Sequence, residues 1–318
     1  MFSLFPYPLC PETQLALMDR NSAVCAQHAP RENYLLAALP LADYERLLPD
    51  LESVPLPPGR IIHHAGDGQK YLYFITSGIV SRCYVTQDGA SVESAVTGNE
   101  GVIGVSSFLG GDSTPSQALV VSAGHAYRLG VGVMKGEFKQ GSPLPYLLLR
   151  YTLALIRQIG QTAACIRHHS LRQQLCRFVL SRLDRLCSNE LAMTHELIAN
   201  MLGVRREGVT EAAGQLQEER LIRYGRGHIT VLDRRALEKH ACECYALLKS
   251  EFEHLSPYRI EHLPRPAGQH VQSDLRGNAL WDPPESRDLG QRYRAGSLRR
   301  QAGTGVNADF LRGIRISG

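Results

Sequence analysis

One stretch of the sequence decides the fold: Met193–Leu216, which reads MTHELIANMLGVRREGVTEAAGQL. Thr194 is a favourable helix N-cap, and Gly203 permits the positive φ with which many helices end. A second helix is expected to begin near Arg205, after Val204 has packed inward. The apolar residues recur at helical spacing: Leu197, Ile198, Met201 and Leu202 in the first helix, and Val209, Ala212, Ala213 and Leu216 in the second. The segment therefore predicts two helices joined by a tight turn.

The outward face of the second predicted helix carries side chains suited to reading DNA. An Arg near the start of such a helix can donate two parallel hydrogen bonds to O6 and N7 of guanine, and a Glu can accept one from the amino group of cytosine. We also expect Thr194 and His195, at the start of the first helix, to approach phosphate. This arrangement is typical of a helix-turn-helix. The outward residues are Arg205, Arg206, Glu207, Thr210 and Glu211.

The segment that follows, Leu221–Leu232, reads LIRYGRGHITVL and predicts two strands joined by a tight turn at 225–227. Such a hairpin beside a helix-turn-helix forms a "wing". Two short helices and a hairpin could also close an enzyme domain, but here the helical spacing, the turn glycine and the arginines coincide. Three side chains of the wing could touch the DNA backbone: Arg223, Arg226 and His228.

The charge of the chain is unevenly distributed. The chain has 35 basic and 31 acidic residues, a net charge of +4. Residues 1–164 hold 11 basic and 13 acidic side chains, whereas residues 165–235 hold 12 arginines and 8 acidic side chains. The positive surplus of the second segment coincides with the predicted helix-turn-helix, where it favours a phosphate backbone as partner.

Upstream, residues 54–129 consist of short β-rich runs separated by Gly, Pro and Asp, as at Ser77-Gly78 and Asp88-Gly89. Several short strands at roughly ten-residue spacing predict a compact antiparallel barrel or roll. The predicted strands are Arg60–His63, Tyr71–Ile75, Ile79–Thr86, Ser91–Val96, Gln117–Ser122 and His125–Leu129.

Helical periodicity flanks the roll. Helices are predicted over Asn33–Leu48, from Pro145 onward, over Ser170–Leu186 and over Arg234–Glu253. The helix after Pro145 carries a heptad seam, which either packs on its own domain or pairs with a second copy, and we favour pairing. The seam residues are Leu148, Thr152, Leu155, Ile159, Thr162 and Ile166.

These elements predict an α+β protein. No run approaches the roughly 18 apolar residues that a membrane helix needs, and the N-terminus lacks a secretion signal, so the expected location is cytoplasmic. The composition of the last segment, rich in Gly, Pro, Arg, Gln and Ser, predicts disorder. The expected parts are an N-terminal arm (1–31), a β-roll sensor domain (32–142), a dimerisation helix (143–169), a winged helix-turn-helix with a C-terminal helix (170–255) and a disordered tail (256–318).

Residues 54–232 resemble the Crp/Fnr family of bacterial transcription regulators, which includes the cyclic-AMP receptor protein. The resemblance rests on Thr194–Leu216, on the hairpin after Leu221-Ile222, and on Leu72–Val80, which reads LYFITSGIV. It implies a cyclic-nucleotide-binding-like roll and a homodimer without enzymatic activity. The implied partners are RNA polymerase and a palindromic operator in double-stranded DNA, with one recognition helix in each major-groove half-site.

The roll departs from the cyclic-nucleotide-binding members of that family, which use a Glu for the ribose and an Arg for the cyclic phosphate. Val105 occupies the expected Glu position, and Ser116-Gln117 stands where the Arg would fall. No Arg occurs between Arg82 and Arg128, and burying an anion without a cation is costly. Cyclic AMP is therefore not the expected effector, and the effector stays unidentified. The residues expected to line its pocket are Val105, Ser106, Ser116, Gln117 and Ile159.

The eight cysteines form no CxxC motif and are expected to be reduced core thiols. On a continuous helix over Arg234–Glu253, Cys242 and Cys244 would point about 200° apart and could not jointly bind a metal. His240 and Cys244 would share a face, but two ligands do not close a zinc site. We therefore predict neither metal nor cofactor.

Two alternatives stay open. One is a metal- or thiol-responsive form of the same regulator, whose DNA affinity would change with chelator or oxidant. The other is a cupin-like β-barrel metalloenzyme, which needs at least three convergent ligands inside the barrel. Its candidate ligands are His63, His64, His125, Glu93 and Glu100.

Overall fold

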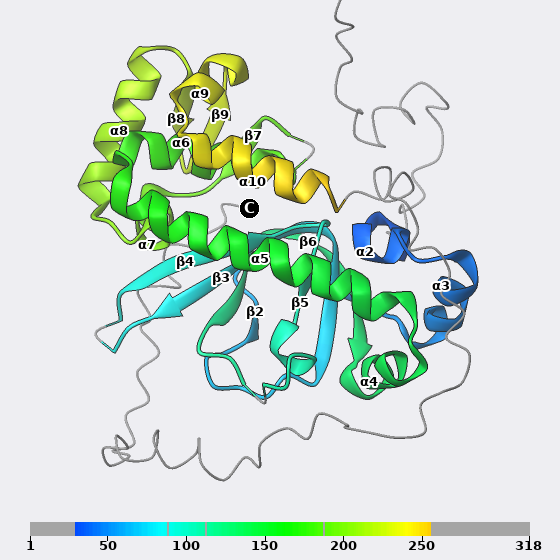
Figure 1. The fold of residues 1–318 in the computed structure, drawn as a ribbon. Helices are drawn as coiled ribbons and strands as arrows, with labels where there is room; N and C mark the ends of the chain where they lie inside the picture. The colour runs from blue at the N-terminus through cyan, green and yellow to red at the C-terminus, as the bar shows by residue number, and fades with distance from the viewer. Residues whose placement is uncertain (1–28, 88, 112, 187, 256–318) are drawn as a thin grey trace, which may run out of the picture.

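The computed structural model describes residues 29–255 except 88, 112 and 187. A β-roll lies on one side of a long helix, α5 (Pro143–His168), and a smaller helical domain with its own sheet lies at one end (Figure 1). The predicted tail and nearly all of the predicted N-terminal arm lie outside the described residues. Among the residues described, no helix combines the length and apolar composition needed to cross a membrane.

The N-terminal half begins with short helices and continues into the roll. The helix predicted over 33–48 is divided in two, because Pro40 cannot donate a backbone hydrogen bond and instead precedes the second helix as its N-cap. The elements are η1 (Pro30–Glu32), α2 (Tyr34–Ala37), α3 (Leu41–Leu47), η2 (Leu48–Asp50), β1 (Glu52–Leu56), β2 (Ile61–His63), β3 (Tyr71–Val85), β4 (Ser91–Thr97), β5 (Val102–Ile103), η3 (Val105–Ser107), β6 (Gln117–Gly130) and α4 (Val131–Gln140).

The strands of the roll are antiparallel, in the order β1-β6-β3-β4, with β2 paired to β6 and β5 to β3. The predicted antiparallel roll is therefore confirmed. The turn predicted at Ser77-Gly78 is wrong, because β3 runs straight through it. A Cβ on Gly78 would lie 2.6 Å from the carbonyl oxygen of Ala123, and one on Gly124 would lie 2.0 Å from that of Ser77. These glycines instead let β3 and β6 approach each other where their pairing is bulged.

Helix α5 packs one face against the roll. The Tyr151 hydroxyl lies 3.0 Å from Thr97 Oγ1, and Gln158 donates to the carbonyl of Val96 at 3.2 Å. Most of the predicted seam belongs to this inner face and is not available for pairing. The buried seam residues are Leu148, Thr152, Leu155 and Thr162.

The exposed apolar residues of α5 follow the same heptad spacing on a neighbouring face. Tyr146, Leu149, Leu153 and Ile156 are 63%, 49%, 50% and 59% exposed. The sequence-based seam was therefore assigned to the wrong face. A helix that is apolar on two faces gives two overlapping patterns, and periodicity does not tell which one the roll covers.

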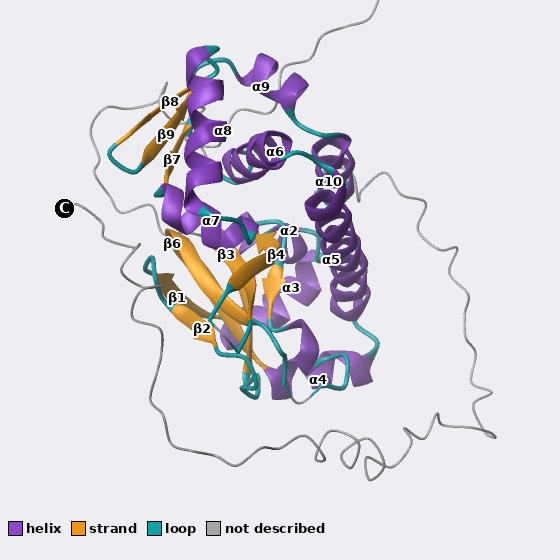
Figure 2. Cartoon of the chain, turned by 90° about the vertical axis from the view of Figure 1, so that its left-hand side faces the viewer, coloured by secondary structure: helices purple, strands orange, loops and turns teal. Residues whose placement is uncertain are grey.

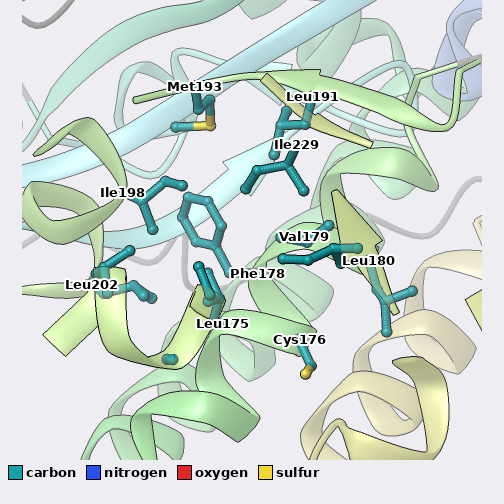
Figure 3. Close-up of a cluster of buried hydrophobic side chains, with 14 of the residues drawn as sticks. Leu175, Cys176, Phe178, Val179, Leu180, Leu191, Met193, Ile198, Leu202 and Ile229 are labelled. Atoms are coloured by element: carbon teal, nitrogen blue, oxygen red, sulfur yellow. The ribbon is translucent and has the colours of Figure 1, made fainter. Parts of the chain in front are cut away.

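The C-terminal domain encloses a core centred on α6, where Phe178 lies among Leu175, Ile198 and Leu202 (Figure 3). Ser170 caps α6 by accepting from the backbone N–H of Gln173. The elements are α6 (Leu171–Leu183), β7 (Glu190–Ala192), α7 (His195–Leu202), α8 (Arg206–Glu218), β8 (Ile222–Gly225), β9 (His228–Val231), α9 (Arg234–His240) and α10 (Glu243–Glu253).

Two buried ion pairs fasten this domain to the roll, where α7 lies against the strands (Figure 2). Arg182 of α6 contacts Glu93 of β4 at 2.5 Å, with side chains 1% and 11% exposed. Arg185 contacts Glu100 at 2.8 Å. Because a buried charge without a partner is strongly unfavourable, these pairs fix how the two parts dock.

We expect Glu93→Ala to lower the free energy of unfolding by about 3 kcal/mol, because it leaves the Arg182 guanidinium buried without its partner. Urea unfolding of the full-length protein, followed by circular dichroism, measures this. The matched control is Glu52→Ala, which removes an exposed partner of Arg128 and should have a much smaller effect. Equal losses in the two variants would show that the Arg182 pair does not hold the docked arrangement.

Candidate nucleic-acid interface

The first helix of the predicted motif is formed as expected. Thr194 caps α7, its hydroxyl oxygen accepting from the backbone N–H of Leu197 at 3.2 Å. Gly203 ends the helix in the left-handed conformation at φ 68°. The turn then brings Val204 against the core of the domain.

The second helix, α8, presents the predicted polar side chains to solvent. It begins at Arg206, with Arg205 as an N-cap residue whose side chain makes no capping hydrogen bond. Arg205, Arg206, Glu207 and Thr210 are exposed. The opposite face is buried by the four residues predicted for it: Val209, Ala212, Ala213 and Leu216.

His195 has a position that the sequence did not indicate. Its side chain is 8% exposed, its ring stacks on that of Tyr224 with centroids 3.8 Å apart, and its Nδ1 lies 3.0 Å from Thr210 Oγ1. Burial lowers the pKa of His195, and the charge of Arg206 lowers it further. The ring therefore joins α7, α8 and the wing inside the protein, which corrects the expectation that it is presented to phosphate.

The wing has the predicted strand–turn–strand form. Gly225 pairs with His228, so the turn consists of only Arg226 and Gly227, at φ 53° and φ 81°. Two positive-φ residues are the mark of the tight turn that suits a twisted hairpin. A non-glycine residue in this conformation costs about 1 kcal/mol, so Arg226 is held at the tip of the wing at some expense of stability.

The arginines of this surface are free to meet an anion. Arg205, Arg206, Arg223 and Arg226 are exposed, and none of the acidic side chains that the structure describes forms an ion pair with them. By contrast, Arg172 on α6 contacts Glu219 at 2.5 Å. Helix α8 and the wing thus place unneutralised positive charge on one domain, as phosphate contacts require.

The residues predicted for the effector pocket fall into two groups in the roll. Val105 is buried in the same apolar cluster that Ile159 of α5 contacts. The Ser106 hydroxyl donates to Gln69 Oε1 at 2.5 Å, and Gln117 begins β6 opposite Cys83. The Val105 side chain, at the position expected for the Glu, has no polar atom that could bond a ribose hydroxyl.

The second group, around Ser116, contains a cation that the sequence pattern did not indicate. Arg82 of β3 is 8% exposed, and its Nη1 donates to Ser116 Oγ at 3.4 Å. Its Nε and Nη2 are buried without a hydrogen-bond partner among the described residues. The expectation that an anion near Ser116 would have no cationic partner is therefore wrong, because Arg82 reaches that position from a neighbouring strand.

Two family models match the chain. The model described as "Crp-like helix-turn-helix domain" matches residues 173–240, and the model described as "Cyclic nucleotide-binding domain" matches residues 53–140. Both cover the elements just described, in the order expected. This is the domain pair of a Crp/Fnr-type transcription regulator.

Curated relatives of this Crp/Fnr protein include two global nitrogen regulators. That of Nostoc sp. is 25% identical over 181 residues, 54% of this chain and 81% of the relative. That of Synechococcus elongatus is 24% identical over 194 residues, 57% of this chain and 86% of the relative. Together with the two domain matches, these relatives support a Crp/Fnr-type transcription regulator with a helix-turn-helix DNA-binding domain.

Solved structures support the fold of this Crp/Fnr regulator. A transcriptional regulator of the Crp/Fnr family from Eubacterium rectale aligns with a TM-score of 0.54 at 24% identity, covering 65% of this chain and 98% of the other. FixK2 from Bradyrhizobium japonicum aligns with a TM-score of 0.54 at 18% identity, covering 60% and 98%.

The cupin-like alternative does not fit this Crp/Fnr regulator. Two of its candidate ligands, Glu93 and Glu100, are neutralised by Arg182 and Arg185. Among the described residues, the metal-ligand atoms that converge belong to a different set, outside the roll. The roll therefore does not assemble the ligand set that the alternative needs.

Proposed function

We propose that this regulator binds a palindromic operator in double-stranded DNA as a homodimer, with α8 of each copy in a major groove. The observation that carries the proposal is the start of α8, where Arg205 and Arg206 are exposed and unneutralised while the opposite face is buried. These two arginines, with Glu207 and Thr210, would face base edges. Contact residues for phosphate would be Thr194, Arg223 and Arg226.

In this proposal the two copies pair through the exposed face of α5. Tyr146, Leu149, Leu153 and Ile156 are followed at the same spacing by Gly160 and Ala163, which are also exposed. Alternating steps of three and four residues are the spacing of a coiled-coil seam. An apolar stripe of this kind is unfavourable in water and is stabilised when a second copy covers it.

The proposed function does not include cyclic AMP as the effector. A buried Val105 offers no acceptor for a ribose hydroxyl, so cyclic AMP is not expected to control the protein. The unsatisfied guanidinium of Arg82 favours a ligand with an anionic or acceptor group. RNA polymerase as a partner, a cytoplasmic location and the absence of catalytic activity rest on the resemblance to Crp/Fnr regulators.

Removing Arg206 should cost about 1–3 kcal/mol of DNA-binding free energy and relax the preference at one base position. Operators selected from random DNA, at a stated salt concentration, would first be measured with the wild type. Arg226→Ala should instead weaken binding to all sequences alike and reduce its salt dependence. The charge-matched control is Lys139→Ala on α4, and an Arg206→Ala variant as tight and selective as this control would contradict the groove assignment.

Replacing Leu153 with Glu should weaken dimerisation by about 3 kcal/mol or more, roughly a hundredfold, because each copy would bury a charge in the seam. Sedimentation velocity over a concentration series measures the change. Leu41→Glu on α3 is the control, since Leu41 is 59% exposed and lies outside the seam. A Leu153→Glu protein that remains a dimer would move the interface to another face.

Cyclic AMP should leave both the melting temperature and the operator affinity unchanged. A ligand at about 100 times its Kd would stabilise the folded protein by about 2.7 kcal/mol, which thermal unfolding detects easily. The cyclic-AMP receptor protein, measured in parallel, is the positive control. A concentration-dependent stabilisation that Arg82→Ala abolishes would show that the roll does bind the cyclic nucleotide.

A further inference from the structure

Four potential metal ligands meet where α5 ends and α10 begins: Cys165, His169, Cys242 and Cys244. One ligand atom from each lies within 4.8 Å of all the others. Cys165 Sγ is 3.5 Å from Cys242 Sγ, and Cys244 Sγ is 3.5 Å from His169 Nδ1. These side chains belong neither to helix α8 nor to the roll.

The spacing of these atoms fits a single tetrahedral ion. With Zn–S and Zn–N bonds of about 2.3 and 2.1 Å, two sulfurs in such a site lie about 3.8 Å apart, and a sulfur and a nitrogen about 3.6 Å apart. The two distances of 3.5 Å are close to both values. A disulfide would require about 2.05 Å, and the three cysteines are free thiols.

His169 is oriented as a ligand. Its Nε2 lies 3.1 Å from Glu243 Oε1, while Nδ1 faces the sulfurs. Metal-binding histidines usually donate the N–H of the second ring nitrogen to a carboxylate, which leaves the lone pair of the first nitrogen directed at the ion. Buried cysteines that merely filled space would not need a histidine held in this way.

The site is closed to bulk solvent. Cys165, Cys242 and Cys244 are 0%, 4% and 0% exposed, and the His169 side chain is 16% exposed. Four protein ligands complete the coordination, as in structural zinc sites. Three sulfur donors and one imidazole select zinc over magnesium or calcium, which prefer oxygen.

The sequence pattern wrongly predicted one continuous helix through Cys242 and Cys244. The helix predicted over 234–253 is broken after His240, and Cys242 is the extended N-cap of α10 at φ −74° and ψ 163°. Cys242 and Cys244 therefore turn to the same side, contrary to the expectation for one continuous helix. His240 lies elsewhere, its Nδ1 3.2 Å from an amino group of Arg172.

We propose that Cys165, His169, Cys242 and Cys244 bind one zinc ion, which fastens α10 to the end of α5. The two helices lie side by side (Figure 1), and the Arg157–Glu251 ion pair at 2.6 Å joins them farther along. Ser170, the N-cap of α6, directly follows His169. If the proposed function holds, the ion therefore sets the angle at which the DNA-binding domain leaves the dimerisation helix.

Zinc content of the full-length protein tests the site directly. Protein purified with zinc and then dialysed should retain about one equivalent, and cobalt substitution should give the intense visible bands and thiolate charge transfer of a tetrahedral sulfur-rich site. Cys244→Ser and Cys165→Ser should lose the ion, and Glu243→Gln should bind it about tenfold more weakly. Cys176→Ala, which changes a buried cysteine of α6 outside the site, is the control and should retain it.

Less than about 0.1 equivalent in the wild type, or full retention by Cys244→Ser, would overturn the site, as would a Cys165–Cys242 disulfide found by mass spectrometry. Hydrogen exchange tests the fastening: zinc removal should speed exchange in α10 and at the end of α5 by at least about tenfold, and unchanged exchange would refute it. DNA binding is measured in a separate assay. Zinc-loaded protein that binds no DNA sequence selectively would refute the proposed function and leave the zinc site intact.

Discussion

Of the two ion pairs that dock the halves, the pair of Arg182 holds the most deeply buried positive charge. Arg182 is among the largest side chains that are fully buried, and its guanidinium has few places to find compensation inside a protein. Glu93 of the roll supplies the compensating negative charge. The centroid of the Phe178 ring lies 3.3 Å from the guanidinium carbon of Arg182. A carboxylate of the roll therefore helps to set the position of the DNA-binding domain.

The same carboxylate lies between the Arg82 region of the roll and the helix-turn-helix. Glu93 also accepts from the hydroxyl of Ser81, the neighbour of Arg82 on β3. Arg182 in turn contacts the sulfur of Met201 in α7 at 3.5 Å. A ligand that moved β3 would thus act within one residue of the ion pair, and an ion pair that shifted would act directly on the helix-turn-helix. Contiguous contacts of this kind are one route by which coupling between sites can travel.

Sequence reasoning succeeded where local chemistry decides the structure. The helix-turn-helix was predictable because a cap, a positive-φ glycine and two apolar stripes act within 24 residues. It failed where a distant partner decides: the roll covers Leu148 and Leu155, so the free seam of α5 lies on another face. Arg82 reaches Ser116 only through strand pairing, and the break before Cys242 carries no Gly or Pro signal.

The conformation of Arg226 has a consequence for how this protein could evolve. Asparagine or glycine would adopt a φ of 53° with less strain, so selection for thermal robustness alone would tend to remove the arginine. If the wing contacts DNA as proposed, the phosphate contact of Arg226 is the gain that offsets this strain. Homologues adapted to heat could resolve the conflict by moving the positive charge one strand position away and leaving the tip to a more permissive residue.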